Sequence, residues 1–541
     1  MAAMQASLSG STGGRIFLLL TCCVLLVFLL YRLGVSDPPS RAGDGPEAGD
    51  TRPAREELVS GDLPAARPQS FAKVPPEAPV EAPRPDAPMH EGKDGQRAEE
   101  NGVLPFAPPA AHFNLLKMGG ADGSTLLVIG GIQGDEPGGF SAAAILSFAY
   151  RIHKGRLWVV PDLNFPSILR RSRGVSGDMN RKFAALDVSD PEFEAVSRIK
   201  SILLDEEVDL VLNLHDGSGF YRPSWEDKLR NPQRWGQSLI IDQEKMIFPP
   251  FLLKETAGRV EAEVNGALLD PAHRYHIYNT LTAEGNKEMA KTLSWFSVRN
   301  GKPAFGIEAS KEFTTEYRTY YHLRVVEAFM RLLGIEFERD FVLNPKGVRA
   351  ALNSNILLSA FEDRVILHLD NVRPRLFRIP FKKDCLPDVR GSKPLLALVR
   401  EKDEWRVAYG NNTLTHINPE FMDFDESLQT MELIVDGKAT SVNPGDIVQV
   451  REYFMVNVPE GYRVNAIGAQ KEVRGSEAGV LLRRKDFMPR FSLDKDASIF
   501  RVEAYKGKAF SGMILVRFGD AAGRPVKSLT AGSGPESELG F

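Results

Sequence analysis

Three polar residues in this sequence have the types and spacing of a catalytic metal site. Gln133 and Glu136 stand three residues apart in GIQGDEPGG, and His215 directly follows the mostly apolar run VDLVLNL. A catalytic zinc ion takes three protein ligands with N, O or S donors and keeps a fourth position for water, whose pKa falls to about 7. Two ligands from one turn and a third from a distant strand would meet this requirement.

The same residues allow other interpretations. Residues 130–139 also fit an ordinary tight turn between a strand and a helix. A phosphate-binding loop is disfavoured, because the segment matches neither G-x-G-x-x-G nor G-x-x-x-x-G-K-[ST]. A lone histidine such as His215 is more often structural than a ligand. Asp216 beside it is either an orienting partner for the site or a turn residue before Gly217.

The elements that must position these residues are predicted from hydrophobic periodicity and from Gly and Pro punctuation. Strands are expected at residues 124–131, 156–164 and 208–214, and helices at 138–155 and from Pro191 onward. Strands that alternate with helices imply a mixed or parallel sheet covered on both faces. Sites in such sheets gather at the carboxyl ends of the strands. Gln133, Glu136 and His215 all lie just past such ends.

Length and charge limit what this site can belong to. The chain has 541 residues, of which 43% are hydrophobic, so it has material for about three domains of roughly 100 to 200 residues each. Its formal net charge is −4. Nucleic-acid binding depends on clustered positive charge, so no DNA or RNA partner is expected.

The N-terminal segment is predicted to reach a membrane. Residues 16–31 form an apolar run between Arg15 and Arg32, slightly short of the roughly 20 residues that span a bilayer. A signal peptide and an uncleaved anchor both fit, but no small-x-small cleavage site follows, which favours a signal anchor at residues 1–33. The Pro/Ala-rich stretch 34–110 is predicted to be a disordered linker. This arrangement places the remainder outside the cytoplasmic membrane, at a distance from it.

After about residue 342 the sequence changes character. Short β-type runs separated by Gly, Pro, Asn and Asp turns replace the helical periodicity. We expect one β domain at 343–424, a second at 425–530 and a polar tail at 531–541. No second constellation of reactive residues appears, so substrate positioning or contact with a partner protein is the expected role. Cys385 is the only cysteine beyond the apolar run, so no disulfide is expected within the folded part.

Four motifs in this order resemble the zinc metallocarboxypeptidases: GGIQGDEPGG, RSRGVSGDMNRKF, LNLHDG and FGIEAS. Gln133 stands where the usual pattern of that family has its first histidine. The same glutamine is a feature of the helical-cell-shape-determining murein D,L-carboxypeptidases of Gram-negative bacteria. The resemblance covers residues 113–338 well and implies a mixed-sheet α/β carboxypeptidase domain. It also implies that one Zn²⁺ ion is held by Gln133, Glu136 and His215.

The resemblance also assigns the remaining roles. Glu308 is the expected general base and then acid. Arg173 is expected to face the scissile carbonyl and stabilise the developing oxyanion. Asn180 and Arg181 are expected to bind the terminal carboxylate of the substrate. Asp178 is expected to orient the loop that carries these cations.

The implied activity is a periplasmic, zinc-dependent D,L-carboxypeptidase, anchored to the inner membrane by its N-terminal segment or released into the periplasm by cleavage. It would trim the peptidoglycan tripeptide stem of a muropeptide to a dipeptide by releasing diaminopimelate, and so affect cell shape. The resemblance also points to cell-wall or cell-shape proteins as partners of the β domains. Two alternatives stay open on the sequence: a metal-dependent deacylase of small amides on the same fold, and a non-catalytic peptidoglycan-binding protein in which Gln133 marks a lost metal.

Overall fold

The computed structural model describes residues 105–106, 113–470 and 475–520. The expected anchor at 1–33 and the expected tail at 531–541 lie outside the described residues. So does the expected linker at 34–110, apart from the short strand β1 (Pro105–Phe106). Within the described part of the chain, no helix is long and apolar enough to cross a bilayer. The anchor, the linker and the tail therefore stay predictions.

A seven-stranded mixed sheet forms the centre of residues 113–339, in the order β10-β9-β11-β6-β3-β5-β2. Parallel pairing joins β5 to β3, β3 to β6 and β6 to β11, whereas β2 and β9 pair antiparallel with their inner neighbours. The strands are β2 (Leu116–Gly119), β3 (Thr125–Ile129), β5 (Arg156–Val160), β6 (Leu210–Gly217), β9 (Ser238–Ile241), β10 (His276–Asn279) and β11 (Ala304–Ser310). The expected mixed sheet is confirmed, and the carboxyl ends of β3, β6 and β11 share one edge.

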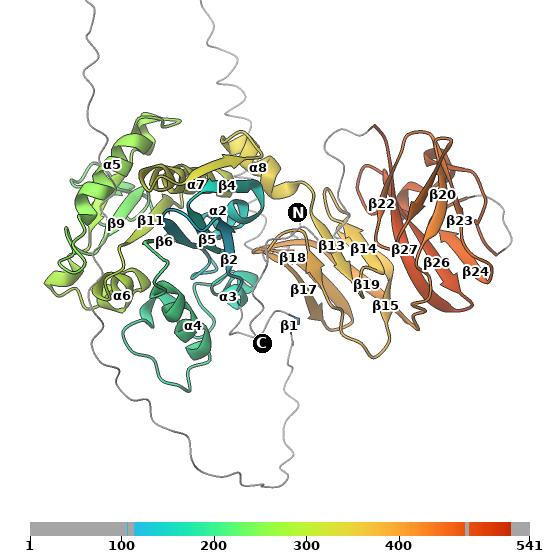
Figure 1. Ribbon diagram of the computed structural model, residues 1–541, viewed down its shortest axis with the longest axis horizontal. Coiled ribbons are helices and arrows are strands. Elements are labelled where there is room, and N and C mark those ends of the chain that lie inside the picture. The colour runs from blue at the N-terminus through green and yellow to red at the C-terminus, as the bar shows by residue number, and fades with distance from the viewer. Residues whose placement is uncertain (1–104, 107–112, 471–474, 521–541) are drawn as a thin grey trace, which may run out of the picture. The chain divides into compact units, whose positions relative to one another are not determined.

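Helices cover both faces of this sheet, with α2 and α7 on one face and α4 and α6 on the other (Figure 1). The helices are α2 (Pro137–Ala149), α3 (Phe165–Arg170), α4 (Phe193–Leu203), α5 (Leu253–Asn265), α6 (Leu293–Arg299) and α7 (Thr315–Leu332). In α4, Val196, Ile199 and Leu203 are spaced three and four residues apart and are buried, as expected for an amphipathic helix that packs through one face. Pro137 suits the first turn of α2, because its missing N–H would have no partner there.

The helix expected at 138–155 is shorter than predicted. It ends at Ala149, and the next five residues form β4 (Tyr150–Lys154), which pairs antiparallel with β12 (Glu336–Arg339). Tyr150 is buried, and its hydroxyl donates to Glu327 Oε1 at 2.8 Å. The pairing partner lies about 180 residues further along the chain, so local periodicity did not reveal the strand.

The expectation that helices end before Asn344 is wrong. α8 (Pro345–Asn353) follows, with Asn344 as its N-cap: the Asn344 side chain accepts from Gly347 N at 2.7 Å. Val348 and Leu352 are its buried face. Asn followed by Pro is a helix-start signal, but a nine-residue helix leaves too few turns for a clear periodicity.

Beyond α8 the chain is β-rich, as expected. A five-stranded sheet has the order β1-β17-β18-β19-β15, and two four-stranded sheets have the orders β21-β20-β23-β25 and β22-β27-β26-β24. The strands are β13 (Leu357–Ala360), β14 (Val365–His368), β15 (Arg375–Lys382), β16 (Arg390–Gly391), β17 (Leu396–Glu401), β18 (Glu404–Tyr409), β19 (Asn412–Met422), β20 (Met431–Val435), β21 (Lys438–Val442), β22 (Ile447–Val450), β23 (Tyr453–Asn457), β24 (Tyr462–Ala466), β25 (Leu482–Arg483), β26 (Ile499–Lys506) and β27 (Ala509–Phe518).

Three hydrophobic cores hold these parts together. One surrounds the seven-stranded sheet, and a second lies between the two four-stranded sheets. The third joins β13–β19 to Phe140 and Ala144 of α2 and to Phe165 and Ile168 of α3. Gly410, between β18 and β19, makes this contact possible: a Cβ there would stand 3.0 Å from the Phe140 ring. The domain boundaries expected at 342 and 424 stay predictions.

Candidate active site

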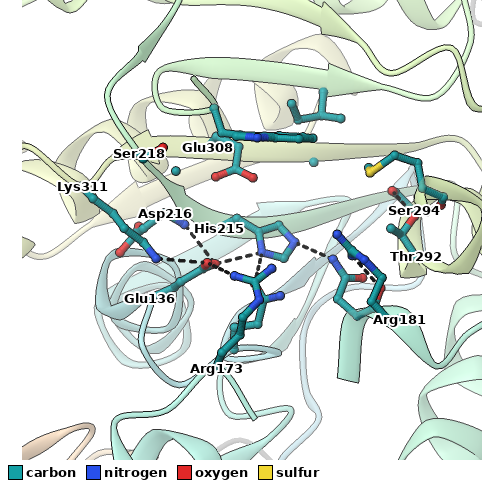
Figure 2. A pocket seen from close by; sticks show the side chains of 17 residues that line it. Glu136, Arg173, Arg181, His215, Asp216, Ser218, Thr292, Ser294, Glu308 and Lys311 are labelled. Carbon is teal, nitrogen blue, oxygen red and sulfur yellow. Dashed lines mark hydrogen bonds and ion pairs between the residues drawn. The ribbon is translucent and has the colours of Figure 1, made fainter. Parts of the chain in front are cut away.

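A cavity of about 300 Å³ opens where β6 and β11 end. Figure 2 shows the side chains that line it. The seven residues expected to bind the metal or to act on the substrate are all among them: Gln133, Glu136, Arg173, Asn180, Arg181, His215 and Glu308. They come from four separate segments of the chain, which only the sheet and its connecting turns bring together.

Gln133, Glu136 and His215 are buried and present their donor atoms to one another. His215 Nδ1 lies 3.0 Å from Gln133 Oε1 and 3.0 Å from Glu136 Oε2. Ligands of a tetrahedral zinc ion, each about 2.0 to 2.1 Å from the metal, stand about 3.3 Å apart. One carboxylate, one imidazole and one amide oxygen at this spacing therefore fit a single divalent metal ion.

Asp178 determines which atom of Gln133 faces the histidine. Gln133 Nε2 donates to Asp178 Oδ1 at 2.8 Å, which leaves the amide oxygen directed at His215. Asp178 also accepts from Asn180 N at 3.0 Å and from Arg173 Nε at 3.0 Å. Burial raises the pKa of Asp178, but the Gln133 hydrogen bond and the charges of Arg173 and Arg181 outweigh it, so the pKa lies below its ordinary value. The carboxylate thus stays ionised and holds the amide.

Gly134 keeps the Gln133 turn tight against α3. A Cβ on Gly134 would stand 2.1 Å from both the carbonyl carbon and the carbonyl oxygen of Ser167. Both atoms belong to the backbone and cannot rotate away. The turn that carries Gln133 therefore requires glycine at this position.

We expect Gly134→Ala to destabilise the protein by about 1 to 3 kcal/mol, because the turn must move away from α3. The same movement should pull Gln133 out of the donor group and lower metal content. Thermal unfolding and metal analysis check both effects. Gly120→Ala is the matched control, because no atom lies within 4 Å of a Cβ there. Equal melting temperatures for the two variants would contradict the close approach of Gly134 to the Ser167 backbone.

Asp216 is a buried partner of the site and not a turn residue. It lies within β6, accepts from Gly138 N at 2.8 Å and pairs with Arg318 Nη1 and His322 Nε2, each at 3.1 Å. Its own N–H donates to Glu136 Oε2 at 3.1 Å. Burial raises the pKa of Asp216, but His322 and Arg318 outweigh it and hold the pKa below its ordinary value.

Arg318 and His322 were not predicted from the sequence. Their spacing of four residues on α7 places both on one helix face, and this is the signal that was available. Through Asp216 they fix the end of β6 that carries His215.

Glu308 lies opposite the donor group. It pairs in register with His215 across β11 and β6, and its carboxylate points toward Glu136 and His215 (Figure 2). Burial raises the pKa of Glu308 well above its ordinary range, and the charges of Glu136 and Asp216 raise it further. Lys311 and Arg173 act in the opposite direction.

Three cations border the cavity. Arg173 Nη1 lies 3.3 Å from Glu136 Oε1, and Lys311 Nζ lies 3.5 Å from the same oxygen. Arg181, whose side chain is 32% exposed, stands at the other end of the cavity and donates to the carbonyl of Asn180. Lys311 was not predicted from the sequence, although its place three residues after Glu308 pointed to the same strand end.

A second group of metal-binding residue types occurs on β17 to β19. Donor atoms of Glu401, Glu404 and His416 lie within 4.8 Å of one another. However, Glu401 pairs with Arg406 and Glu404 pairs with Arg375. These guanidinium groups already neutralise both carboxylates, so the group makes a poor metal site.

Comparisons with known proteins show the family of this chain. Residues 116–353 match the family described as a carboxypeptidase controlling helical cell shape, catalytic part, and residues 424–519 match the C-terminal domain of metallo-carboxypeptidase. Crystal structures of the cell shape determinant protein Csd4 from Helicobacter pylori, apo and tripeptide-bound, share 40% identity with this chain at a TM-score of 0.70. The match covers 75% of this chain and 100% of Csd4. This chain belongs to the cell-shape carboxypeptidase family.

Family membership confirms the expected enzyme class. The protein is a metallocarboxypeptidase, which implies a bound metal ion and excludes the alternative of a protein without catalytic activity. No curated protein sequence matches the chain. The roles of the individual cavity residues stay predictions, supported by the distances given above.

Proposed function

We propose that this cell-shape carboxypeptidase is a zinc-dependent D,L-carboxypeptidase that releases diaminopimelate from the uncrosslinked tripeptide stem of peptidoglycan. The observation that carries the proposal is the single cavity in which the donor group, Glu308 and the Asn180–Arg181 pair face one another. Csd4, described as a D,L-carboxypeptidase, has been crystallised with a tripeptide and with mDAP. The 40% identity over the whole of Csd4 supports the same substrate class here.

We propose Gln133, Glu136 and His215 as the zinc ligands. When bound, zinc would polarise the scissile carbonyl and lower the pKa of the attacking water. The amide oxygen of Gln133 is neutral and a poorer donor than imidazole, so this set should hold zinc less tightly than one with histidine at that position.

The protein's own groups then divide the work. Glu308 takes the proton of the attacking water and returns it to the leaving amine, as general base and then acid. Arg173 stabilises negative charge on the carbonyl oxygen as it develops. Asn180 and Arg181 hold the terminal carboxylate, and the planar guanidinium of Arg181 offers two parallel N–H groups to it. This last contact restricts cleavage to the C-terminal residue.

The direct test is product analysis with the zinc-loaded protein. Muramyl tripeptide should yield free diaminopimelate and the dipeptide. A tetrapeptide, whose terminal carboxylate belongs to a further residue, should be a poor substrate. Hydrolysis of N-acyl amino acids without diaminopimelate release would favour the deacylase alternative.

Arg181→Ala should raise KM by roughly 30-fold or more, because one partner of a charge-assisted pair is lost. The wild type should cleave tripeptide with an amidated C-terminus poorly. Arg181→Ala should cleave the amidated tripeptide and the tripeptide with a free carboxylate at similar rates. Steady-state kinetics on both substrates measure this. Arg170→Ala, which removes an exposed arginine outside the cavity, is the matched control. Unchanged discrimination between acid and amide would remove Arg181 from carboxylate binding.

The substrate class also suggests where the protein acts. We propose that residues 1–33 anchor it in the inner membrane and that residues 34–110 act as a spacer that lets the folded part reach the wall from the periplasmic side. The basis is the apolar run at 16–31 and the Pro/Ala-rich composition that follows it. Fractionation of cells, with protease added to the periplasm, tests this: recovery in the cytosol would contradict it.

A further inference from the structure

A second, larger cavity lies in the β-rich part of the chain. Its volume is about 1010 Å³, and none of its lining residues lines the active-site cavity. Strands β15 and β19 contribute one wall and β24 and β26 the other, and residues 490–493, at the end of a short 3-10 helix (Pro489–Phe491), line one side. β15 and β24 are outer strands of their sheets. We refer to it as the β cavity.

The β cavity concentrates positive charge. Among the described residues, seven cationic and two acidic side chains line it, although the chain as a whole carries a net charge of −4. Arg378, Arg490 and Lys508 are exposed, and none of them pairs with a carboxylate of the described residues. Unpaired arginines at a concave surface suit carboxylates, which they bind through two parallel hydrogen bonds.

A buried arginine holds the wall in place. Arg501 is 5% exposed, and its Nη1 and Nη2 donate to the backbone carbonyls of Arg378 and Phe377 at 2.9 and 3.2 Å. Arg501 Nη1 also pairs with Glu503 Oε1 at 2.9 Å, and Tyr505 donates to Glu503 Oε2 at 2.6 Å. These contacts connect β26 to β15, so Arg378 stands on a preorganised strand.

A β-bulge turns two neighbouring side chains outward at this point. The register of β15 against β19 shifts between Phe377 and Ile379, and Arg378 adopts φ +52°. Side chains of successive strand residues normally point to opposite faces, but here Phe377, which is 62% exposed, and Arg378 are both exposed. Bulges of this kind re-aim side chains and are common near binding sites.

Aromatic rings accompany the cations. Phe377, Phe421 and Phe491 line the β cavity with exposed fractions of 62%, 54% and 37%. Exposed rings beside guanidinium groups fit a ligand that carries both carboxylates and apolar or sugar faces. A simple inorganic anion would make no use of the rings.

We propose that the β cavity is a second, non-catalytic binding site for the polymeric substrate, recognising the free carboxylates of stem peptides on the wall glycan. This rests on the proposed function. Binding one stem here raises the local concentration of neighbouring stems at the active site, without any new contact in that site. The β-rich part would thus hold the enzyme on the insoluble wall while successive stems are trimmed.

The test compares two double charge reversals in the full-length, zinc-loaded protein. Arg378→Glu with Arg490→Glu changes the β cavity, and Arg400→Glu with Lys438→Glu changes exposed cations outside it. Sedimentation with purified sacculi should show that the apparent Kd of the first variant is raised about tenfold or more. The introduced carboxylates then repel the carboxylates of the stem peptides. Turnover of soluble muramyl tripeptide should stay at the wild-type rate, which also shows that the variant is folded.

Three outcomes would overturn the proposal of a second binding site. They are equal sedimentation of the first variant and the wild type, equal losses in both double variants, and undiminished binding of wild type to sacculi whose carboxylates have been amidated. Failure of the proposed function is distinguishable, because it appears as absent diaminopimelate release from soluble tripeptide by the wild type. That result does not depend on the sedimentation measurement.

Discussion

Glu308→Gln should lower kcat by roughly 10²- to 10⁴-fold while zinc content stays at the wild-type level. Glutamine keeps the shape of the side chain but cannot accept the proton of the attacking water. Glu308 faces the donor group from β11 without contributing an atom to it, so the metal ligands are untouched. Zinc stoichiometry and diaminopimelate release, measured on the same preparation, check the two parts of the prediction.

Glu312→Gln is the matched control, because this glutamate is exposed and stands four residues further along the chain. It should keep wild-type activity. Full activity of Glu308→Gln, or loss of zinc from it, would show that Glu308 is not the base.

The pH profile gives an independent check on Glu308. Burial and the charges of Glu136 and Asp216 raise its pKa, so the acid limb of kcat/KM should lie above about 4.3, the ordinary glutamate value. The base works when deprotonated, so activity is present above the raised pKa and is lost as the pH falls through it. The residual activity of Glu308→Gln should lack this limb.

Gln133→Ala should lower zinc affinity by more than roughly 100-fold. Loss of a residue that only hydrogen-bonds to a metal ligand already lowers metal affinity by roughly 10- to 100-fold, and Gln133 is itself an expected ligand. The substitution removes the amide oxygen that stands 3.0 Å from His215 Nδ1. Metal titration of the purified protein, followed by activity at saturating zinc, measures the effect.

Gln133→His is the informative counterpart, since imidazole is the better donor and should retain or tighten the metal. In the wild type, Gln133 Nε2 donates to Asp178 Oδ1 at 2.8 Å. In the variant, the ring N–H of the histidine must donate to Asp178 instead. Equal zinc content in wild type and Gln133→Ala would remove Gln133 from the ligand set.

Gln133, Glu136 and His215 could be singled out from the sequence itself, because each follows a strand pattern with a local cause. The roles of Arg173, Asn180, Arg181 and Glu308 came from the resemblance to a known family. Gly134 and Pro137 mark the turn and the helix start on either side of Glu136, and buried apolar runs lead into His215 and Glu308. Alternating strands and helices then place the strand ends at one edge. Residues close together in the chain are sufficient for that argument.

The tertiary structure decided what depends on partners far away in the chain. Asp178 orients Gln133 across 45 residues, and His322 holds Asp216 across 106 residues. β4 exists because β12 pairs with it, although its residues continue an apparent helical pattern. The β cavity likewise forms only where β15 meets Arg501.

The physical reason is the range of each interaction. Turn chemistry and hydrophobic periodicity act over a few neighbouring residues, so the sequence by itself determined most element types and the mixed sheet. The four family motifs marked the reactive side chains. Hydrogen bonds between buried polar groups and the pairing of strand edges depend on which distant segments meet, and this is settled only when the chain packs. The orientation of the Gln133 amide, the raised pKa of Glu308 and the charge of the β cavity all arise at that stage.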